Sequence, residues 1–363
     1  MTLLRMDVPA LSRGAADRSE DVRDPHRARR AWSTARVLVL DDAGRAQLDG
    51  VALRWTPAAS MADEPPADGV LLGEVGGIDH WAVRGPLDGG PAGTRRAGLR
   101  EIGALLSDTD AGLLTTATAL LTWHAAAPHC PRCGLRSTPG VTGWSRICPN
   151  EHEDFPRTDP AVIVLVHDGA DSIVLARQPI WPPGRVSVLA GFVEAGESLE
   201  AAVVREIHEE IGLWVREVTY LGSQPWPFPR SLMVGFAARA DRDAPLLPRD
   251  GEIESAQWFD RTTVRRLIES EDPAVDWASA GPTASPGLSA AEASHTAPVD
   301  AGTAFATVLP GQVSIARRMI DAWALAGASG PTTLAGASGP TTLAGASGPT
   351  LARASGPTDA SGD

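Results

Sequence analysis

Runs of apolar residues, separated by glycine, proline and aspartate, recur along the chain from residue 35 onward. Such runs predict β-strands, because branched and aromatic side chains favour extended backbone and the residues between them favour turns. The strands expected first are residues 35–40, 50–55, 69–75 and 80–85. Leucines at helical spacing follow from residue 97 to 126, in two segments broken near residues 108–112. We therefore expect a small α+β N-terminal domain over residues 35–126, built on an antiparallel sheet.

The residues before this domain have a different composition. Residues 1–34 contain many arginine, aspartate and serine residues and few large apolar ones. A segment that buries little apolar surface does not offset the entropy lost on ordering. The pattern thus predicts a mobile N-terminal arm.

The second half of the chain alternates strand-like and helix-like patterns. A continuous apolar run at 161–166 predicts a strand buried on both faces, and 173–178 predicts its hairpin partner. Further strands are expected at 186–191, 215–222, 231–239 and 252–259, and helices at 198–212, 261–270 and 314–326. The first helix has clear ends, because Ser198 is a favoured N-cap and Gly212 tolerates the left-handed conformation. This order predicts an α/β domain over residues 159–324.

Two segments lack large apolar residues. Residues 271–308 are rich in alanine, serine, proline, glycine and threonine, which predicts a flexible insertion within the α/β domain. From residue 325 a unit of the type LAGASGPT recurs four times. Repeats of small residues with proline cannot bury a core, so residues 325–363 are expected to be a disordered tail.

Charge and hydropathy narrow the class of protein. The 363 residues carry a formal net charge of -13, which argues against a broad surface that neutralises phosphates. No run of 18 or more apolar residues is present, and the N-terminus mixes acidic residues with its arginines, unlike a targeting peptide. We expect a cytoplasmic protein with no membrane partner.

The three cysteines lie in a loop-rich segment, residues 127–158, with little apolar content of its own. Cys130 and Cys133 have the spacing of a metal knuckle, Cys148 follows 14 residues later, and His152 stands near the place of a fourth ligand. Zinc accepts thiolate and imidazole, so the four side chains could form one structural zinc site. The alternative is a ribbon-like segment that has lost its metal and is held by packing.

The strongest chemical signal is an acidic helix. Arg205, Glu206, Glu209 and Glu210 fall within two turns, and at about 100° per residue the three glutamates share one arc. Carboxylates this close repel one another. A divalent cation such as magnesium or manganese, which prefers carboxylate oxygens, would convert that repulsion into affinity.

The spacing of this region resembles the signature of the Nudix hydrolase family. The pattern G-x5-E-x7-R-E-U-x-E-E-x-G-U, in which U is a bulky aliphatic residue, is matched at all its specified positions. These positions are Gly191, Glu197, Arg205, Glu206, Ile207, Glu209, Glu210, Gly212 and Leu213. The resemblance implies a Nudix α/β/α sandwich with a mixed sheet, preceded here by a zinc ribbon and the small α+β domain.

The resemblance also implies roles for these residues. Glu206 and Glu210 would be metal ligands, Glu209 a ligand or the general base, and Arg205 would orient a neighbouring glutamate. The backbone carbonyl of Ala190 would be a further metal ligand.

Two more positions complete the acidic site. Glu197 fits a structural partner of Arg205. A later strand commonly supplies another carboxylate; Ser255 stands where it is expected, so Glu254, or alternatively Glu252, is its candidate.

A second motif narrows the substrate. The sequence SQPWPFPRS resembles the signature of the NADH pyrophosphatase branch, and its prolines and aromatic residues would present rigid faces to a planar ring. The substrate-binding residues implied are Gln224, Pro225, Trp226, Pro227, Phe228, Pro229, Arg230 and Ser231, together with Phe155, Phe192 and Ala316. Arg100 is a further candidate, for contact with phosphate.

The resemblance therefore implies an enzyme that splits NADH or NAD into nicotinamide mononucleotide and AMP, working as a homodimer. Removal of an NAD cap from the 5′ end of RNA is the second expectation, because no basic RNA channel is evident. A third is a catalytically silent zinc-ribbon binding module, which the intact acidic residues disfavour.

Overall fold

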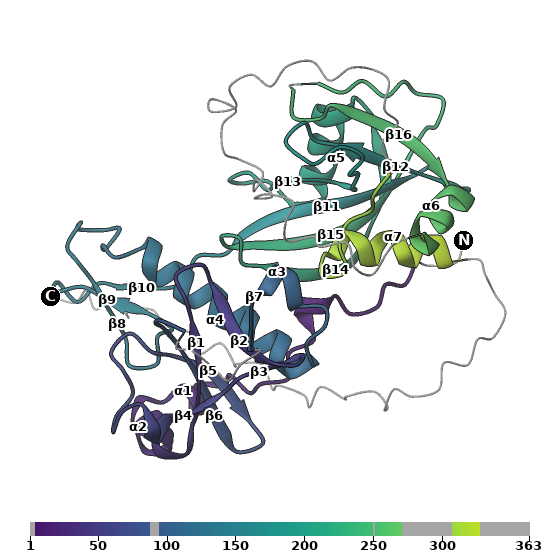
Figure 1. Ribbon diagram of the computed structural model, residues 1–363. Helices are drawn as coiled ribbons and strands as arrows, with labels where there is room; N and C mark the ends of the chain where they lie inside the picture. The colour runs from purple at the N-terminus through teal and green to yellow at the C-terminus, as the bar shows by residue number, and fades with distance from the viewer. Residues whose placement is uncertain (1–3, 88–93, 250, 271–306, 327–363) are drawn as a thin grey trace, which may run out of the picture. The chain divides into compact units, whose positions relative to one another are not determined.

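The computed structural model describes residues 4–87, 94–249, 251–270 and 307–326 (Figure 1). Most of the expected insertion at 271–308 and nearly all of the expected tail at 325–363 lie outside these residues. No helix in the described ranges is both long enough and apolar enough to cross a membrane.

The N-terminal segment differs from the expected mobile arm. Its described residues form short helices, namely η1 (Ala10–Ser12), α1 (Glu20–Arg23), α2 (Pro25–Ala31) and η2 (Trp32–Thr34). The Trp32 side chain is buried, with its ring edge-on to Trp81 at 5.4 Å and its Nε1 donating to the Ala62 carbonyl. Arg27 forms ion pairs with Glu74 and Asp79. Together with the buried side chains of Leu11 and Val22, these contacts anchor a segment whose average composition predicted a mobile arm.

Two small sheets follow. The first has the order β4-β1-β6-β5 and the second β3-β2-β7. Their strands are β1 (Arg36–Leu40), β2 (Arg45–Asp49), β3 (Ala52–Leu53), β4 (Thr56–Pro57), β5 (Val70–Val75), β6 (Ile78–Arg84) and β7 (Arg95–Gly98). The expectation of antiparallel pairing is confirmed for every pair except β1 and β6, which pair in parallel. Side-chain alternation predicts a strand but does not specify the direction of its partner.

The helical part of this region is α3 (Leu99–Ile102) and α4 (Asp108–Ala126). The break falls before Asp108, because the Ser107 hydroxyl accepts a hydrogen bond from the Asp110 amide and begins α4 there. Gly112, which suggested a later break, lies inside α4. A Cβ at this glycine would lie 2.4 Å from Gly14 Cα, so the residue permits close packing rather than ending the helix.

The C-terminal half is built on one mixed sheet with the order β14-β15-β11-β12-β16, and β13 also pairs with β11. The strands are β11 (Asp159–His167), β12 (Ser172–Arg177), β13 (Leu189–Phe192), β14 (Val215–Trp226), β15 (Ser231–Ala240) and β16 (Ser255–Asp260). The helices are α5 (Leu199–Ile211), α6 (Arg261–Glu269) and α7 (Ile315–Leu325). The pairing of β11 with β15 is parallel and that with β13 is antiparallel.

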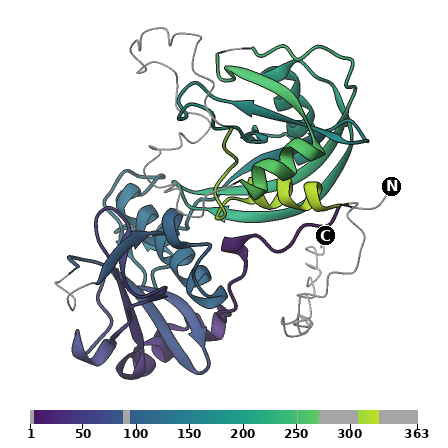
Figure 2. The same ribbon diagram turned by 45° about the vertical axis from the view of Figure 1, so that its right-hand side comes forward.

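Alternate residues of β11 enter two different cores. Val162 and Val164 pack in the core that contains Ile207 of α5, whereas Ile163 packs in the core that contains Met319 of α7. The sheet therefore has helices on both faces, as Figures 1 and 2 show. This confirms the predicted α/β/α sandwich and explains why β11 is apolar at consecutive positions.

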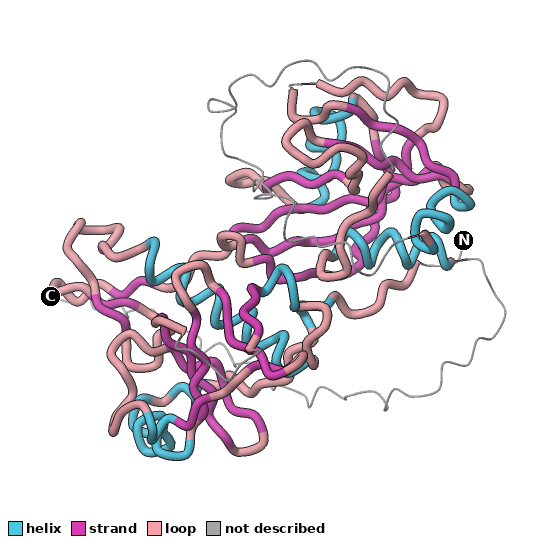
Figure 3. Tube along the Cα trace, in the orientation of Figure 1, coloured by secondary structure: helices cyan, strands magenta, loops and turns pink. Residues whose placement is uncertain are grey.

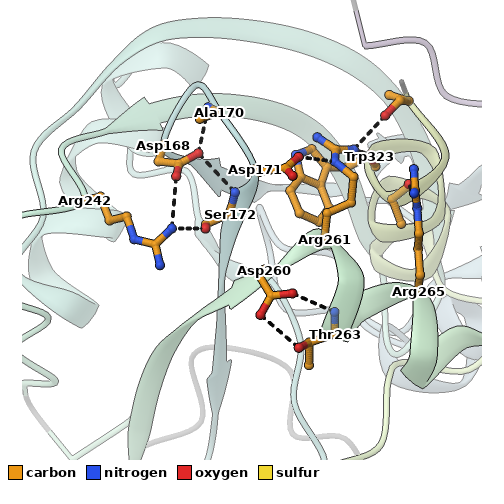
Figure 4. Close-up of polar contacts among 12 residues, drawn as sticks. Asp168, Ala170, Asp171, Ser172, Arg242, Asp260, Arg261, Thr263, Arg265 and Trp323 are labelled. Atoms are coloured by element: carbon orange, nitrogen blue, oxygen red, sulfur yellow. Dashed lines mark hydrogen bonds and ion pairs between the residues drawn. The ribbon is translucent and has the colours of Figure 1, made fainter. Parts of the chain in front are cut away.

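Polar contacts fix the helices at the edge of this sheet (Figure 4). Asp260 caps α6 by accepting hydrogen bonds from the Thr263 amide and hydroxyl. Arg261 lies over the Trp323 ring at 4.1 Å and donates to carbonyls at the end of α7, and Arg265 donates to the Ala324 carbonyl at 2.8 Å. Terminal carbonyls of α7 are thus satisfied by side chains of α6.

Candidate active site and zinc cluster

The helix that carries the acidic residues has the predicted ends. The Ser198 hydroxyl accepts a hydrogen bond from the Ala201 amide, and Gly212 has the left-handed φ of 76° that ends α5. These two residues fix the length of the helix. They therefore fix which of its side chains face the end of β13.

Arg205 organises the acidic residues around it. Its guanidinium donates to both oxygens of Glu197 at 2.8 Å, contacts Glu206 and Glu209 at 3.0 Å, and donates to the Phe192 carbonyl at 2.9 Å. This bidentate pair with Arg205 lowers the pKa of Glu197. The geometry agrees with Arg205 as an orienting residue and Glu197 as its structural partner.

Gly191 lies directly under Glu206. A Cβ at this position would lie 1.9 Å from the Glu206 carboxyl carbon, far inside contact distance. The carboxylate therefore rests against bare backbone at the end of β13, next to Ala190, which pairs with Ile163 in the sheet. Only glycine permits this approach.

We expect Gly191→Ala to reduce activity by about 10- to 100-fold while the protein stays folded, because the new methyl group displaces the Glu206 carboxylate by an ångström or more. Steady-state kinetics of NADH cleavage and the thermal midpoint check this. Gly85→Ala is the matched control, since a Cβ there meets only Val39 at an ordinary 3.5 Å. Full activity in Gly191→Ala would contradict the placement of Glu206.

Glu210 is the most unusual group of the site. It is only 5% exposed, and its Oε2 has no hydrogen-bond partner in the described part of the chain. Burial, followed by the charges of Glu206, Glu252 and Glu209, raises its pKa well above the ordinary value. Burial also raises the pKa of Glu206, although Arg205 opposes this. A buried carboxylate among other carboxylates lacks a positive counter-charge.

For the further metal-binding carboxylate expected near β16, Glu252 is a better candidate than Glu254. The Glu254 carboxylate forms an ion pair with Arg177 at 2.9 Å, and its amide donates to the Arg177 carbonyl at 2.8 Å. The charge of Glu252, in contrast, contributes to the raised pKa values of both Glu206 and Glu210. The sequence EIE leaves this choice open, because both acids precede β16 and no strand alternation fixes which of the two carboxylates turns toward α5.

The proline and aromatic motif forms the end of β14, the turn after it and the start of β15. The Trp226 and Phe228 rings meet edge-on at 5.0 Å, and the Arg100 guanidinium lies 4.1 Å from the Phe228 ring centre. Pro227, Phe228 and Pro229 line a cavity of about 960 Å³, with Arg100 on its wall. Burial and then the charge of Arg185 lower the pKa of Arg100. No motif pointed to Arg185, which only the fold brings near.

Other members of the predicted substrate set make contacts within the protein. Gln224 is fully buried and its amide donates to the Val313 carbonyl at 3.1 Å. In the pairing of β14 with β15, Pro225 lies opposite Leu232 and Ser231 lies opposite Trp226. Arg230 forms an ion pair with Asp159 at 2.7 Å. Ala316 is buried in α7. The buried Gln224 and Ala316 thus have structural roles, whereas Arg230 is exposed.

The two predicted phenylalanines differ in exposure. Phe192 packs partly against the core that contains α7, whereas Phe155 is 62% exposed. Phe155 follows β10 in the cysteine segment, so its ring is open to solvent on this chain.

The cysteine segment contains three strands of two residues each, β8 (Thr138–Pro139), β9 (Arg146–Ile147) and β10 (Glu153–Asp154), and is otherwise loops and turns (Figure 3). The ligand atoms of Cys130, Cys133, Cys148 and His152 all lie within 4.8 Å of one another. The Cys133 and Cys148 sulfurs are 3.7 Å apart, and the Cys130 sulfur is 3.6 Å from His152 Nδ1.

These separations fit zinc. Sulfur atoms about 2.3 Å from a tetrahedral zinc ion lie about 3.8 Å from each other. Burial acts to raise the pKa of Cys130, but hydrogen bonds from the Arg132 and Cys133 amides and from His152 lower it to about 6. A thiol that ionises readily is suited to bind a metal.

Comparison with known proteins agrees with this geometry. The NUDIX domain family matches residues 157–278. This chain belongs to the Nudix hydrolase family. Within the family it groups with the branch of proteins named NAD-capped RNA hydrolase NudC. It is 45% identical to the NAD-capped RNA hydrolase NudC of Mycobacterium tuberculosis over 323 residues, which cover 87% of this chain and 95% of that protein.

Two more distant relatives carry related names. NAD-capped RNA hydrolase NudC of Deinococcus radiodurans is 42% identical over 196 residues, 52% of this chain and 69% of that protein. NAD-capped RNA hydrolase NUDT12 of Homo sapiens is 38% identical over 173 residues, 45% of this chain and 37% of that protein.

Proposed function

We propose that this protein hydrolyses the pyrophosphate bond of NADH and NAD. Water attacks one phosphorus atom and breaks its bond to the bridging oxygen, which leaves on the other phosphate, so that AMP and nicotinamide mononucleotide (its reduced form from NADH) each carry one phosphate. The observation that carries this proposal is the buried Glu210 carboxylate, whose Oε2 has no partner in the described part of the chain and which feels the charges of Glu206, Glu252 and Glu209.

The acidic residues suit a divalent cation, magnesium or manganese. Glu206, Glu210 and Glu252 would hold it, with Glu209 and the Ala190 carbonyl as further ligands, and the lone Oε2 of Glu210 would gain its missing partner. When bound, such an ion neutralises the pyrophosphate and makes water a better nucleophile. Arg205 keeps Glu206 and Glu209 in place, and Glu209, half-exposed at the rim, is the candidate for accepting the proton of the attacking water.

The aromatic residues suit the rings of a dinucleotide. Trp226 and Phe228 offer faces for one ring, and Phe192, next to Gly191, offers a face for the other. Arg100 lies against Phe228 with no carboxylate partner in the described part of the chain, so it suits a substrate phosphate. Gln224 and Ala316 act from below by holding the loop and α7.

One assay tests the proposal. Purified protein is incubated with NADH, NAD, ADP-ribose and NAD-capped RNA, with and without magnesium or manganese, and the products are identified. Metal-dependent release of nicotinamide mononucleotide supports the proposal. Absence of cleavage of every substrate in a folded, metal-supplied protein would favour a silent binding module instead.

A second candidate function is removal of the NAD cap from RNA, which uses the same bond and the same residues. The names of the relatives favour it.

The expected homodimer also belongs to this proposal. The open Phe155 ring is available to a second subunit, and the mass in solution, measured by light scattering, tests this.

A further inference from the structure

A second cavity, of about 520 Å³, lies along the outer side of α5, beside the acidic site. Its lining residues are Glu197, Ala201, Val204, Arg205, His208, Glu209 and Trp214. Three of them, Glu197, Arg205 and Glu209, also belong to the network around Arg205. The cavity is therefore continuous with the candidate active site, and no residue of the aromatic loop lines it.

Trp214 is the residue that makes this cavity notable. Trp214 is 66% exposed, whereas every other tryptophan in the described part of the chain is buried or half-buried. The indole stacks on the imidazole of His208, with ring centres 3.8 Å apart and an angle of 16° between the planes. The imidazole covers one indole face and leaves the other face to solvent. A rigid, exposed aromatic face beside a cavity is suited to stacking with a planar ligand.

The charges around the cavity select a base rather than a phosphate. Arg205, the basic residue of the lining apart from the imidazole, is occupied by Glu197, Glu206 and Glu209. A phosphate would find no open cation there and would meet carboxylates instead. A nucleobase needs only the π-face, and its amino groups can donate to exposed carboxylate oxygens such as those of Glu209.

If the proposed function holds, the identity of this base follows from a comparison of the substrate's ring systems with the aromatic residues already assigned to them. NAD has two rings, and these have partners at Phe192 and at Trp226 with Phe228. An RNA chain attached to the adenosine brings a third ring past the acidic site. We propose that Trp214, supported by His208, stacks on the first nucleobase that follows the NAD cap of an RNA substrate, and so favours capped RNA over free NAD.

The test compares one variant on two substrates. In Trp214→Ala, kcat/KM for an NAD-capped RNA should fall about five- to tenfold, the loss typical of one base–aromatic stack. Cleavage of free NAD should stay within twofold of the unaltered protein. A shortened substrate, NAD joined to a single further nucleotide, should already show the loss. Trp214→Phe, which keeps an aromatic face, should restore most of it.

Tyr220→Ala is the matched control, because Tyr220 is 58% exposed on β14 and does not line this cavity. It should affect neither substrate. An equal loss on NAD and capped RNA, or no loss on either, would overturn the inference. So would a smaller particle mass in Trp214→Ala, which would assign the surface to a second copy of the chain. If the unaltered protein cleaves no NAD at all, it is the proposed function that fails.

Discussion

Replacing Glu210 by glutamine is expected to reduce NADH cleavage by at least about 100-fold, because a ligand charge for the catalytic cation is lost and such an ion contributes several kcal/mol to the transition state. The fold should survive, since the substitution keeps the size of the side chain. Metal titration should show weaker binding in parallel. Unchanged cleavage in a folded Glu210→Gln protein would contradict the proposed site.

The same substitution should stabilise the metal-free protein. The pKa of Glu210 is raised above its ordinary value near 4.5, so between these two values the folded state binds more protons than the unfolded state. The free energy of unfolding then falls as pH rises through this window, and that loss remains at neutral pH. Glu210→Gln removes the ionisable group. Without metal, its thermal midpoint at pH 7 should exceed that of the unaltered protein.

Glu252 and Glu254 form a matched pair for this experiment. Glu252→Gln should weaken metal binding and cleavage, because its charge reaches both Glu206 and Glu210. Glu254→Gln should leave cleavage within about threefold, since that carboxylate contacts Arg177 and exposed ion pairs contribute little. A larger loss of cleavage in Glu254→Gln than in Glu252→Gln would indicate that Glu254 is the metal-binding carboxylate.

Loss of zinc is expected to have the largest effect on stability. Purified protein should contain one zinc ion per chain, and His152→Ala or Cys148→Ser should remove it. The strands of the segment from 127 to 158 have only two residues each, so we expect the segment to depend on a bound metal for its order. Metal-free variants should melt more than about 10 °C below the unaltered protein, since structural zinc contributes many kcal/mol.

The neighbouring residue provides the control for the zinc experiment. Glu151 lies outside the cluster and has a left-handed φ of 58°, so Glu151→Gly should keep one zinc ion and an unchanged melting temperature. Zinc content measured by atomic absorption separates the two outcomes. A protein without zinc as purified, equally stable in all variants, would favour the segment held by packing alone.

Several features were predictable because they depend on neighbours along the chain. Ser198 and Gly212 set the ends of α5, and consecutive apolar residues in β11 required helices on both faces of the sheet. The spacing of Cys130, Cys133 and Cys148 likewise indicated a cluster, which the fold closes with His152. In each case a short stretch contains the whole physical requirement.

Other features were not accessible to such patterns. Low average hydrophobicity hid the anchoring of residues 4–34, because a few apolar side chains, Leu11, Val22 and Trp32, are buried in cores completed by distant residues. Alternation along β1 gave no direction for its pairing with β6. Gly112 suggested a break in a helix, whereas it marks a close approach to Gly14.

The sequence by itself determined the family, the acidic helix, the aromatic loop and the cysteine cluster, because fixed spacings on one helix or loop place these side chains together. Only the tertiary structure pairs Glu254 with Arg177, brings the charge of Glu252 to Glu210, buries Gln224 and Ala316, and leaves Trp214 exposed beside Glu209. These outcomes depend on contacts between residues far apart in the chain. Local periodicity carries no information about which distant charge or ring completes a site.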